Sequence, residues 1–263
     1  MNTIKMFQVD AFTDRLFSGN PAAVCILDKW PDDELMQAIA AENNLAETAF
    51  LVAKNESFQI RWFTPTVEVD LCGHATLASA YVLFNCLGHA EAEVNFFSPR
   101  SGDLRVSQQK DILFLDFPTD RLKVTDDHEQ ITRCIKGRPK EVYKGKTDYI
   151  AVIESEQAVR QLQPDLAEIA KLPARGLIVT AKGEQVDFVS RFFAPQSGID
   201  EDPATGSAHT SLIPLWSDRL SKKEMTASQL SKRGGSFICR HNGERCLIGG
   251  SARLFLKGEI SIK

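Results

Sequence analysis

The sequence predicts an α+β fold built from two similar halves. An arginine–aromatic–phenylalanine–small–proline motif occurs twice, at residues 61–65 and 191–195, so the two copies lie 130 residues apart in a chain of 263. Strand-like alternation of apolar and polar residues is frequent, whereas helical spacing is confined to a few segments. The glycine-rich nucleotide-binding motifs of doubly wound folds do not occur. We therefore expect two halves, each a sheet with helices.

Each element is expected from its own local pattern. Alternation and β-branched or aromatic content predict strands over residues 5–12, 22–27, 49–52, 59–63, 92–97 and 112–117. Apolar spacing predicts helices over residues 32–43 and 74–86. In the second half, Pro164 opens a helical pattern that precedes a strand over residues 177–180. A Gly-Gly pair precedes a predicted final strand pair over 252–256 and 259–262, and a solvated helix or loop is expected over 221–232.

The boundary between the halves is predicted near residues 110–121, where a strand runs into a connection. The expected division is residues 1–117, which carry Glu47 and the turn at 72–74, and residues 118–263, which carry the turn at 202–207. The last strand is left open to return to the first half.

Each copy of the repeated motif leads into a turn whose glycine is expected to start a helix, at Gly73 and at Gly206. A glycine lets the backbone approach a ligand closely, and the first N–H groups of a helix, together with its macrodipole, attract an anion. One such turn alone is most often a capped helix start. The duplication favours two anion-binding turns that face one another across a cleft between the halves, and hence a small anionic substrate.

Composition excludes several classes of protein. The net charge of −4 and the isoelectric point near 5.8 leave no basic surface for nucleic acid or an anionic membrane. The longest nearly apolar stretch, residues 75–87, is too short to span a bilayer. Six scattered cysteines and an N-terminus without a leader pattern predict reduced thiols and a cytoplasmic protein. No metal is expected, because Cys239, His241 and Cys246 have no fourth ligand at zinc-like spacing.

Three further segments carry a family resemblance: residues 44–50 (NLAETAF), 72–78 (CGHATLA) and 202–209 (DPATGSAH). Together with residues 9–12 and 19–24, they resemble the phenazine-biosynthesis PhzF-like proteins, and the likeness covers essentially the whole chain. The resemblance implies the diaminopimelate-epimerase-like fold. In that fold two pseudo-symmetric halves each form a barrel-like, mostly antiparallel sheet around a central helix, with the site between them.

The resemblance also implies a reaction and the residues that perform it. Glu47 matches the general acid/base of the PhzF isomerase, which moves a proton between two carbons of a cyclic amino acid with no metal or organic cofactor. His74 and Asp202 match catalytic partners that orient the substrate or assist the proton movement. A homodimer is expected on the resemblance alone. The expected substrate-binding residues are Gly73, Gly206, Ser207, Cys72 and Thr205.

Cys72 and Thr205 decide between two kinds of isomerase. Diaminopimelate epimerases keep a cysteine at each of the two related turns, but here the second turn has Thr205. An aliphatic hydroxyl cannot partner a thiol in a two-base epimerisation. A one-carboxylate isomerase of a small carboxylate-bearing metabolite is therefore favoured over an amino-acid epimerase, and joint action of Cys72 with Glu47 stays open. The other alternative is a non-catalytic metabolite-binding protein, against which the joint presence of Glu47, His74 and Asp202 counts.

Overall fold

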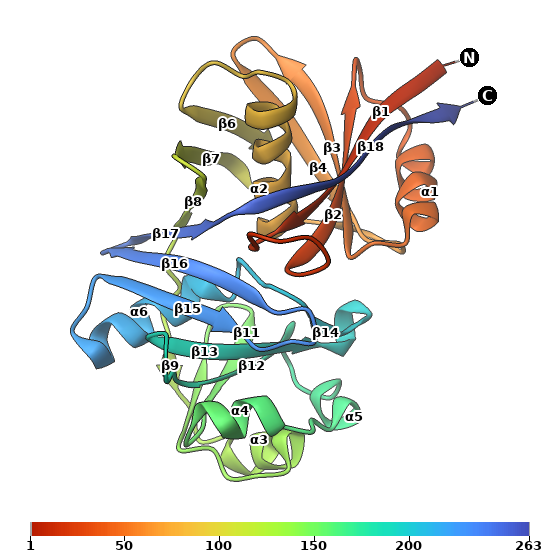
Figure 1. The fold of residues 1–263 in the computed structure, drawn as a ribbon. Coiled ribbons are helices and arrows are strands. Elements are labelled where there is room, and N and C mark those ends of the chain that lie inside the picture. Colours follow the sequence, from red (N-terminus) through yellow and green to blue (C-terminus); the bar gives the residue numbers. More distant parts are fainter. Residues whose placement is uncertain (1, 263) are drawn as a thin grey trace. The chain divides into compact units, whose positions relative to one another are not determined.

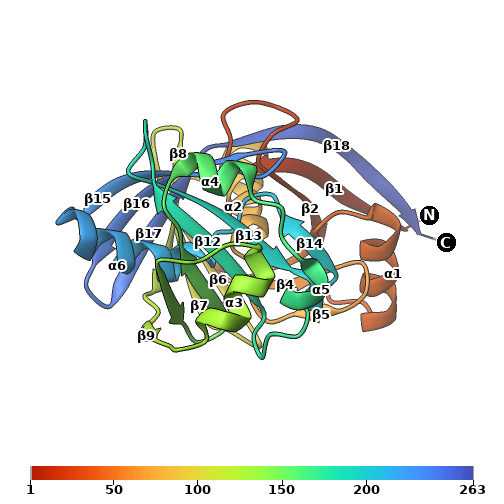
Figure 2. The ribbon, with the colours of Figure 1, turned by 90° about the horizontal axis from the view of Figure 1, so that it is seen from below.

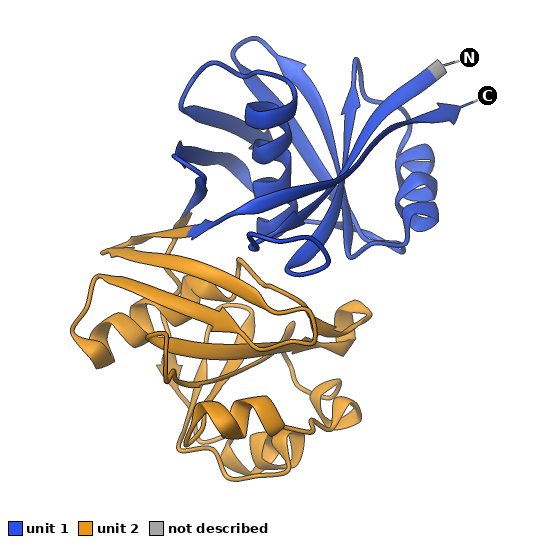
Figure 3. Cartoon of the chain, in the orientation of Figure 1, with its two compact units in different colours: residues 1–116, 249–263 blue, residues 117–248 orange. Residues whose placement is uncertain are grey.

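The computed structural model describes residues 2–262, which form two compact units (Figure 3). Unit 1 comprises residues 1–116 and 249–263, and unit 2 comprises residues 117–248. No helix among the described residues is both long enough and apolar enough to cross a membrane. Each unit combines a mainly antiparallel sheet with helices, as an α+β fold requires.

Unit 1 surrounds a central helix, α2, with strands (Figure 1). The parallel strands β2 and β3 are buried almost throughout, because α2 packs on them and α1 contacts β3 from outside the barrel. The C-terminal strand β18 pairs along the whole of β1 (Figure 2). Its elements are β1 (Asn2–Ala11), β2 (Asn20–Leu27), α1 (Asp33–Asn43), β3 (Glu47–Lys54), β4 (Ser57–Phe63), β5 (Glu68–Val69), α2 (Gly73–Tyr81), the π-helical turn η1 (Val82–Cys86), β6 (Glu93–Ser98), β7 (Gly102–Gln109), β8 (Ile112–Pro118) and β18 (Ala252–Ile262).

Unit 2 has its own apolar core, in which α3, α4 and α5 pack against β11, β12 and β13. Its elements are β9 (Lys123–Val124), α3 (His128–Ile135), β10 (Glu141–Lys144), β11 (Asp148–Val152), α4 (Glu156–Gln161), α5 (Leu166–Ile169), β12 (Gly176–Lys182), β13 (Phe188–Ala194), the 3₁₀ turn η2 (Pro195–Ser197), β14 (Ile199–Asp202), α6 (His209–Leu220), β15 (Glu224–Gln229), β16 (Gly235–Asn242) and β17 (Arg245–Gly250).

The two units repeat one topology. In unit 1, β2 and β3 are parallel, β3 and β4 antiparallel, β4 and β6 parallel, and β6 and β7 antiparallel. Unit 2 has the same sequence of pairings through β11, β12, β13, β15 and β16. The phenylalanine at the third position of the repeated motif pairs with Thr48 in unit 1 and with Leu177 in unit 2. The residues directly before these, Glu47 and Gly176, are therefore equivalent positions.

The arginine of the repeated motif has the same role in both units. Arg61 donates from Nε and Nη2 to the two carboxylate oxygens of Glu68, at 2.7 and 2.8 Å. Arg191 makes the same paired contact with Glu201, at 2.7 and 3.0 Å. Each guanidinium also lies over the phenylalanine two residues along, at 5.2 Å and 4.9 Å from the ring centre. We call each arginine–glutamate pair, Arg61–Glu68 and Arg191–Glu201, a structural clamp. The first connects β4 to β5, and the second connects β13 to β14.

Two expectations for the C-terminal region are wrong. The predicted final strand pair is one continuous strand, β18, whose whole length pairs with β1 and so has no turn. Residues 221–232, predicted as a solvated helix or loop, contain β15, whose alternate side chains Met225, Ala227 and Gln229 are buried. The lysines at 222, 223 and 232 flank this strand, so they obscured a short alternating pattern between them.

Replacing Arg61 or Arg191 by Met should lower the free energy of unfolding by about 2 kcal/mol, since each change leaves a largely buried carboxylate without its bidentate partner. Arg121 is a matched control, because its ion pair with Glu244 is exposed on both sides, and Arg121→Met should leave stability nearly unchanged. Denaturant unfolding followed by circular dichroism measures the three variants. A loss at Arg61 or Arg191 no larger than the control's would contradict the clamp.

Candidate functional site

Glu47 is placed by the way helix α1 ends. Asn44 adopts a left-handed conformation at the C-terminus of α1, which turns the chain into β3. The side chain of Asn43 donates to the hydroxyl of Thr48 at 3.1 Å and so fixes the start of the strand. Glu47 is the first residue of β3 and is 9% exposed. A buried carboxylate needs partners, since isolated burial of a charge is costly.

Cys72 and His74 stand at the start of the central helix. Cys72 precedes α2 in an extended conformation, and its carbonyl accepts from the hydroxyl of Thr76 at 2.6 Å. Residues 73–80 are all buried, which the run of glycine, alanine, serine and threonine permits because small side chains let the surrounding strands come close. The helix therefore holds the imidazole of His74 inside unit 1.

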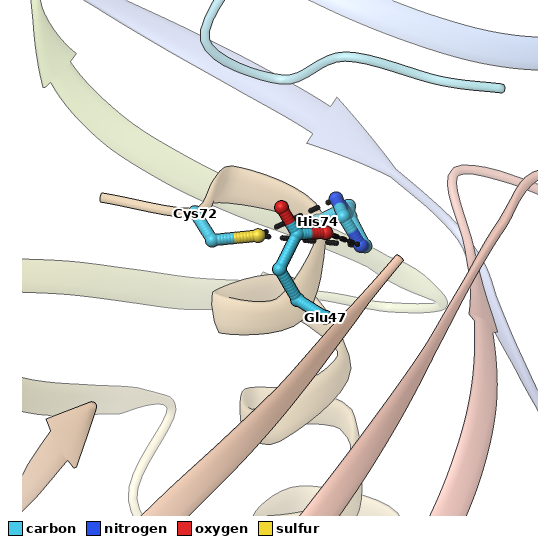
Figure 4. Close-up of side chains that lie close together, drawn as sticks. All are labelled: Glu47, Cys72 and His74. Carbon is cyan, nitrogen blue, oxygen red and sulfur yellow. Dashed lines mark hydrogen bonds and ion pairs between the residues drawn. The ribbon is translucent and has the colours of Figure 1, made fainter. Parts of the chain in front are cut away.

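Glu47, Cys72 and His74 point toward one another (Figure 4). The Oε2 atom of Glu47 lies 3.1 Å from Nε2 of His74, as an ion pair. The Sγ atom of Cys72 lies 3.5 Å from Nδ1 of His74 and 4.0 Å from Nε2. Unit 1 thus brings three of the predicted site residues into direct contact.

Asn20 is a fourth member of this cluster, and the sequence analysis did not single it out. Its side-chain nitrogen lies 3.1 Å from Nδ1 of His74, and Asn20 is fully buried. An asparagine can present either its nitrogen or its oxygen, so it suits both protonation states of the ring. The preceding Gly19 has a φ of +65°, and a Cβ there would lie 2.2 Å from the carbonyl oxygen of Ala11. Only glycine fits at this turn, which positions Asn20 at the start of β2.

The contacts set the protonation of the two neighbours of Glu47. Burial by itself lowers the pKa of His74, but its contacts with Cys72 and Glu47 outweigh burial and hold that pKa well above the usual value. Burial, together with the nearby charge of Glu47, raises the pKa of Cys72 to about 11. Near neutral pH the site therefore holds a protonated imidazole beside Glu47 and a neutral thiol.

The same three side chains are of the types that bind zinc. Their ligand atoms lie within 4.8 Å of one another, and carboxylate, thiolate and imidazole are all zinc ligands. His74 directs one nitrogen at Glu47 and the other at Asn20, so its ring is already engaged on both sides. A metal ion would have to displace these contacts, whereas proton transfer between the side chains uses them as they stand.

The second turn, in unit 2, is built around Gln229, which the sequence analysis missed. The side-chain amide of Gln229 accepts from the backbone N–H of Thr205 at 2.8 Å and donates to the carbonyl of Asp202 at 2.7 Å. The hydroxyl of Thr205 donates to the carboxylate of Asp202 and accepts from Gln229 at 3.0 Å. Asp202, Thr205 and Gln229 are all buried. Gln229 lies in the misread segment 221–232, so no sequence signal identified it.

The remaining predicted residues of this turn lie at its end. Gly206 is buried and Ser207 is partly exposed, and the hydroxyl of Ser207 accepts from Arg175 at 3.0 Å. The prediction that α6 starts at Gly206 is wrong by three residues. Residues 206–208 form a turn with bonds such as His209 N–H to the Gly206 carbonyl at 3.0 Å, and α6 begins at His209. The Asp202–Thr205 bond tightens this segment before the helix begins.

His241 and the cysteines near it serve the packing of unit 2. Nδ1 of His241 lies 3.0 Å from the hydroxyl of Ser217 and Nε2 lies 3.0 Å from the carbonyl of Gly243. Cys239 and Cys246 are fully buried in the core. These three side chains are therefore engaged as core and surface residues of adjacent strands.

Both the sequence and the fold of this chain are similar to those of known proteins. The family model for the phenazine biosynthesis-like protein, PhzC-PhzF, matches residues 9–258. A protein of Pseudomonas aeruginosa named as an uncharacterized isomerase is 51% identical over 259 residues, which cover 98% of this chain and 99% of that protein. A crystal structure of a phenazine biosynthesis protein of the PhzF family from Enterococcus faecalis has a TM-score of 0.96 and 44% identity, over 99% of this chain and 100% of the other.

A more distant likeness concerns the fold. A hydroxyproline epimerase from Agrobacterium vitis has a TM-score of 0.62 at 12% identity, covering 99% of this chain and 91% of the other. This match confirms the predicted epimerase-like α+β architecture. The relatives named isomerases set aside the alternative of a non-catalytic binding protein. The chain is an isomerase, and it belongs to the phenazine biosynthesis-like (PhzF) protein family.

Proposed function

We propose that this isomerase moves a proton between two carbons of a small carboxylate-bearing metabolite, with Glu47 as the general acid/base. The observation that carries the proposal is the buried pair of Glu47 and His74, whose Oε2 and Nε2 atoms are 3.1 Å apart. A carboxylate in such a site can take a proton from carbon and return it to another position, provided that a partner stabilises its charged form between the two steps.

His74 suits the role of that partner. Its protonated ring balances the charge of Glu47 when the carboxylate is ionised, and Asn20 holds the far side of the ring at 3.1 Å. The imidazole is thereby kept in one orientation on α2 while Glu47 changes its protonation. Among residues 2–262, the Oε2 atom of Glu47 has no partner with hydrogen-bond geometry, which leaves it able to accept a proton. These contacts support an acid/base exchange at Glu47 with His74 as its electrostatic partner.

Cys72 fits a supporting role. Its thiol stays neutral near pH 7, because its pKa is about 11, and a neutral thiol is a poor base. At the equivalent turn of unit 2, the hydroxyl of Thr205 is committed to Asp202. Both facts favour the one-carboxylate reaction over an epimerisation with two bases, and the proposed reaction needs no organic cofactor.

Glu47→Gln should abolish proton exchange at the substrate carbon. General acid/base catalysis contributes about 10²- to 10⁴-fold, so the variant should lose at least about a hundredfold in rate. The assay incubates the protein in D₂O with a panel of small carboxylic acids, cyclic amino acids first, and detects deuterium at carbon by mass spectrometry.

The control for this experiment is Glu42→Gln, which removes the same charge from an exposed position of α1. It should keep the wild-type exchange rate, and circular dichroism should show both variants folded. Undiminished exchange in folded Glu47→Gln would remove Glu47 from the reaction.

Cys72→Ser should retain exchange within about fivefold of the wild type, because the thiol is neutral and serine preserves its size and its contact with His74. The rate is measured with the same deuterium assay. A loss as large as that of Glu47→Gln would mean that Cys72 and Glu47 act together as the acid and the base.

The pKa of His74 predicts a pH dependence of stability. Because this pKa is higher in the folded protein than in the unfolded chain, the stabilisation by protonated His74 is complete below about pH 6.5 and is lost as the pH rises through the folded-state value. The wild type should therefore lose stability from pH 6.5 upward more steeply than His74→Gln. Thermal unfolding midpoints at pH 6 and pH 9 test this, and equal slopes would contradict it.

A further inference from the structure

Arg175 is held in a fixed orientation in unit 2 by a buried carboxylate. It donates from Nε to Oδ1 of Asp148 at 2.9 Å and from Nη2 to Oδ2 at 2.5 Å. Asp148 is 2% exposed, and it begins β11 directly beside the start of the parallel strand β12. The guanidinium also lies over the ring of Phe192, 5.0 Å from its centre. A bidentate pair with a stacked face leaves the guanidinium little freedom to rotate.

The third contact of Arg175 sets the role of Ser207. Nη1 donates to the Ser207 hydroxyl oxygen at 3.0 Å. Because a guanidinium only donates, Ser207 accepts in this bond and its own hydrogen must be directed elsewhere. Among residues 2–262 the Ser207 hydroxyl donates to no side chain or carbonyl. Ser207 is partly exposed and 32% of the Arg175 side chain is exposed, so both are accessible within unit 2. The Ser207 hydroxyl can therefore give its hydrogen to an acceptor from outside, beside the positive charge of Arg175.

The internal repeat shows what has changed between the two units. Gly176 is equivalent to Glu47, and a Cβ at Gly176 would lie 2.5 Å from the carbonyl oxygen of Phe193, so no carboxylate fits there. Ser207 is equivalent to His74, because both follow the glycine of their turn. Unit 1 thus places a carboxylate against an imidazole, and unit 2 places a guanidinium against a hydroxyl at the corresponding turn.

We propose that Arg175 and Ser207 form a recognition site for a carboxylate group, with Asp148 as the residue that positions Arg175. The charge of Arg175 is already balanced by Asp148, so the site favours a monoanion over a dianion such as phosphate. The ligand class is the one assumed in the proposed function, which this inference extends. The site is separate in its residues from Glu47 and His74, so the two proposals can fail independently.

Benzoate titrated by calorimetry tests the site, with benzamide as the neutral isostere and inorganic phosphate as the dianion. Arg175→Gln could unfold the protein by leaving Asp148 unpaired, so the main variant is the double change Arg175→Gln with Asp148→Asn, which keeps the pair neutral. It should weaken benzoate binding at least tenfold. Ser207→Ala should weaken it about threefold or more, and Arg175→Lys should retain part of the affinity, because it keeps the charge but loses the bidentate geometry.

Two controls separate this inference from a structural effect and from the proposed function. Arg121→Gln removes an exposed positive charge of unit 2 and should bind benzoate as the wild type does. Glu47→Gln should also bind benzoate normally while losing deuterium exchange. Benzoate affinity within twofold of the wild type in the folded double variant would overturn the proposal. So would equal binding of benzamide, or tighter binding of phosphate than of benzoate.

Discussion

The buried pair of Glu47 and His74 is the interaction on which the architecture of unit 1 depends. Moving a carboxylate out of water costs several kcal/mol, and only a well-placed opposite charge with further hydrogen bonds offsets this. Each element around the pair contributes to that placement. The end of α1 sets Glu47 at the first position of β3, the small residues of α2 let His74 lie inside the barrel, and the turn at Gly19 brings Asn20 to the other ring nitrogen.

The repeat explains why this pair occurs once and not twice. Both units keep the arginine–glutamate clamp and the order of strand pairings, which are requirements of the fold. The positions at the two turns are free of that requirement and have diverged. At the position equivalent to Glu47, Gly176 packs against the backbone of β13. Duplication has thus preserved the scaffold in both units, while one unit carries the buried Glu47–His74 pair and the other carries a guanidinium held by a buried aspartate.

Most of the fold and part of the site were predictable from the sequence. Six strands and both α-helices of unit 1 have local patterns, so they were predicted close to their observed bounds, whereas the short β5 and the largely polar β7 were not predicted. Glu47, Cys72 and His74 were found because they lie in family segments near one another in the fold. Asn20, Gln229 and Arg175 act through contacts with residues 24 to 54 positions away, and such contacts leave no periodicity in the sequence. The same holds for the clamp arginines. Their repeated motif could be identified in the sequence, but their partners Glu68 and Glu201 could not be predicted from it.

The hydrogen bonds of the second turn, at residues 202–207, favour the proposed one-carboxylate isomerisation over an epimerisation with two bases. A residue that exchanges protons with a substrate must have a hydrogen to give or a lone pair to receive one. The Thr205 hydroxyl gives its hydrogen to Asp202 and accepts from Gln229, whose amide also holds the backbone on both sides of the turn. Using Thr205 as an acid would break a buried network of three residues. Thr205 therefore serves to close the turn. Because the Cys72 thiol at the other turn is also held neutral, neither turn offers a ready base, which favours the proposal that Glu47, at the start of β3, is the acid/base group.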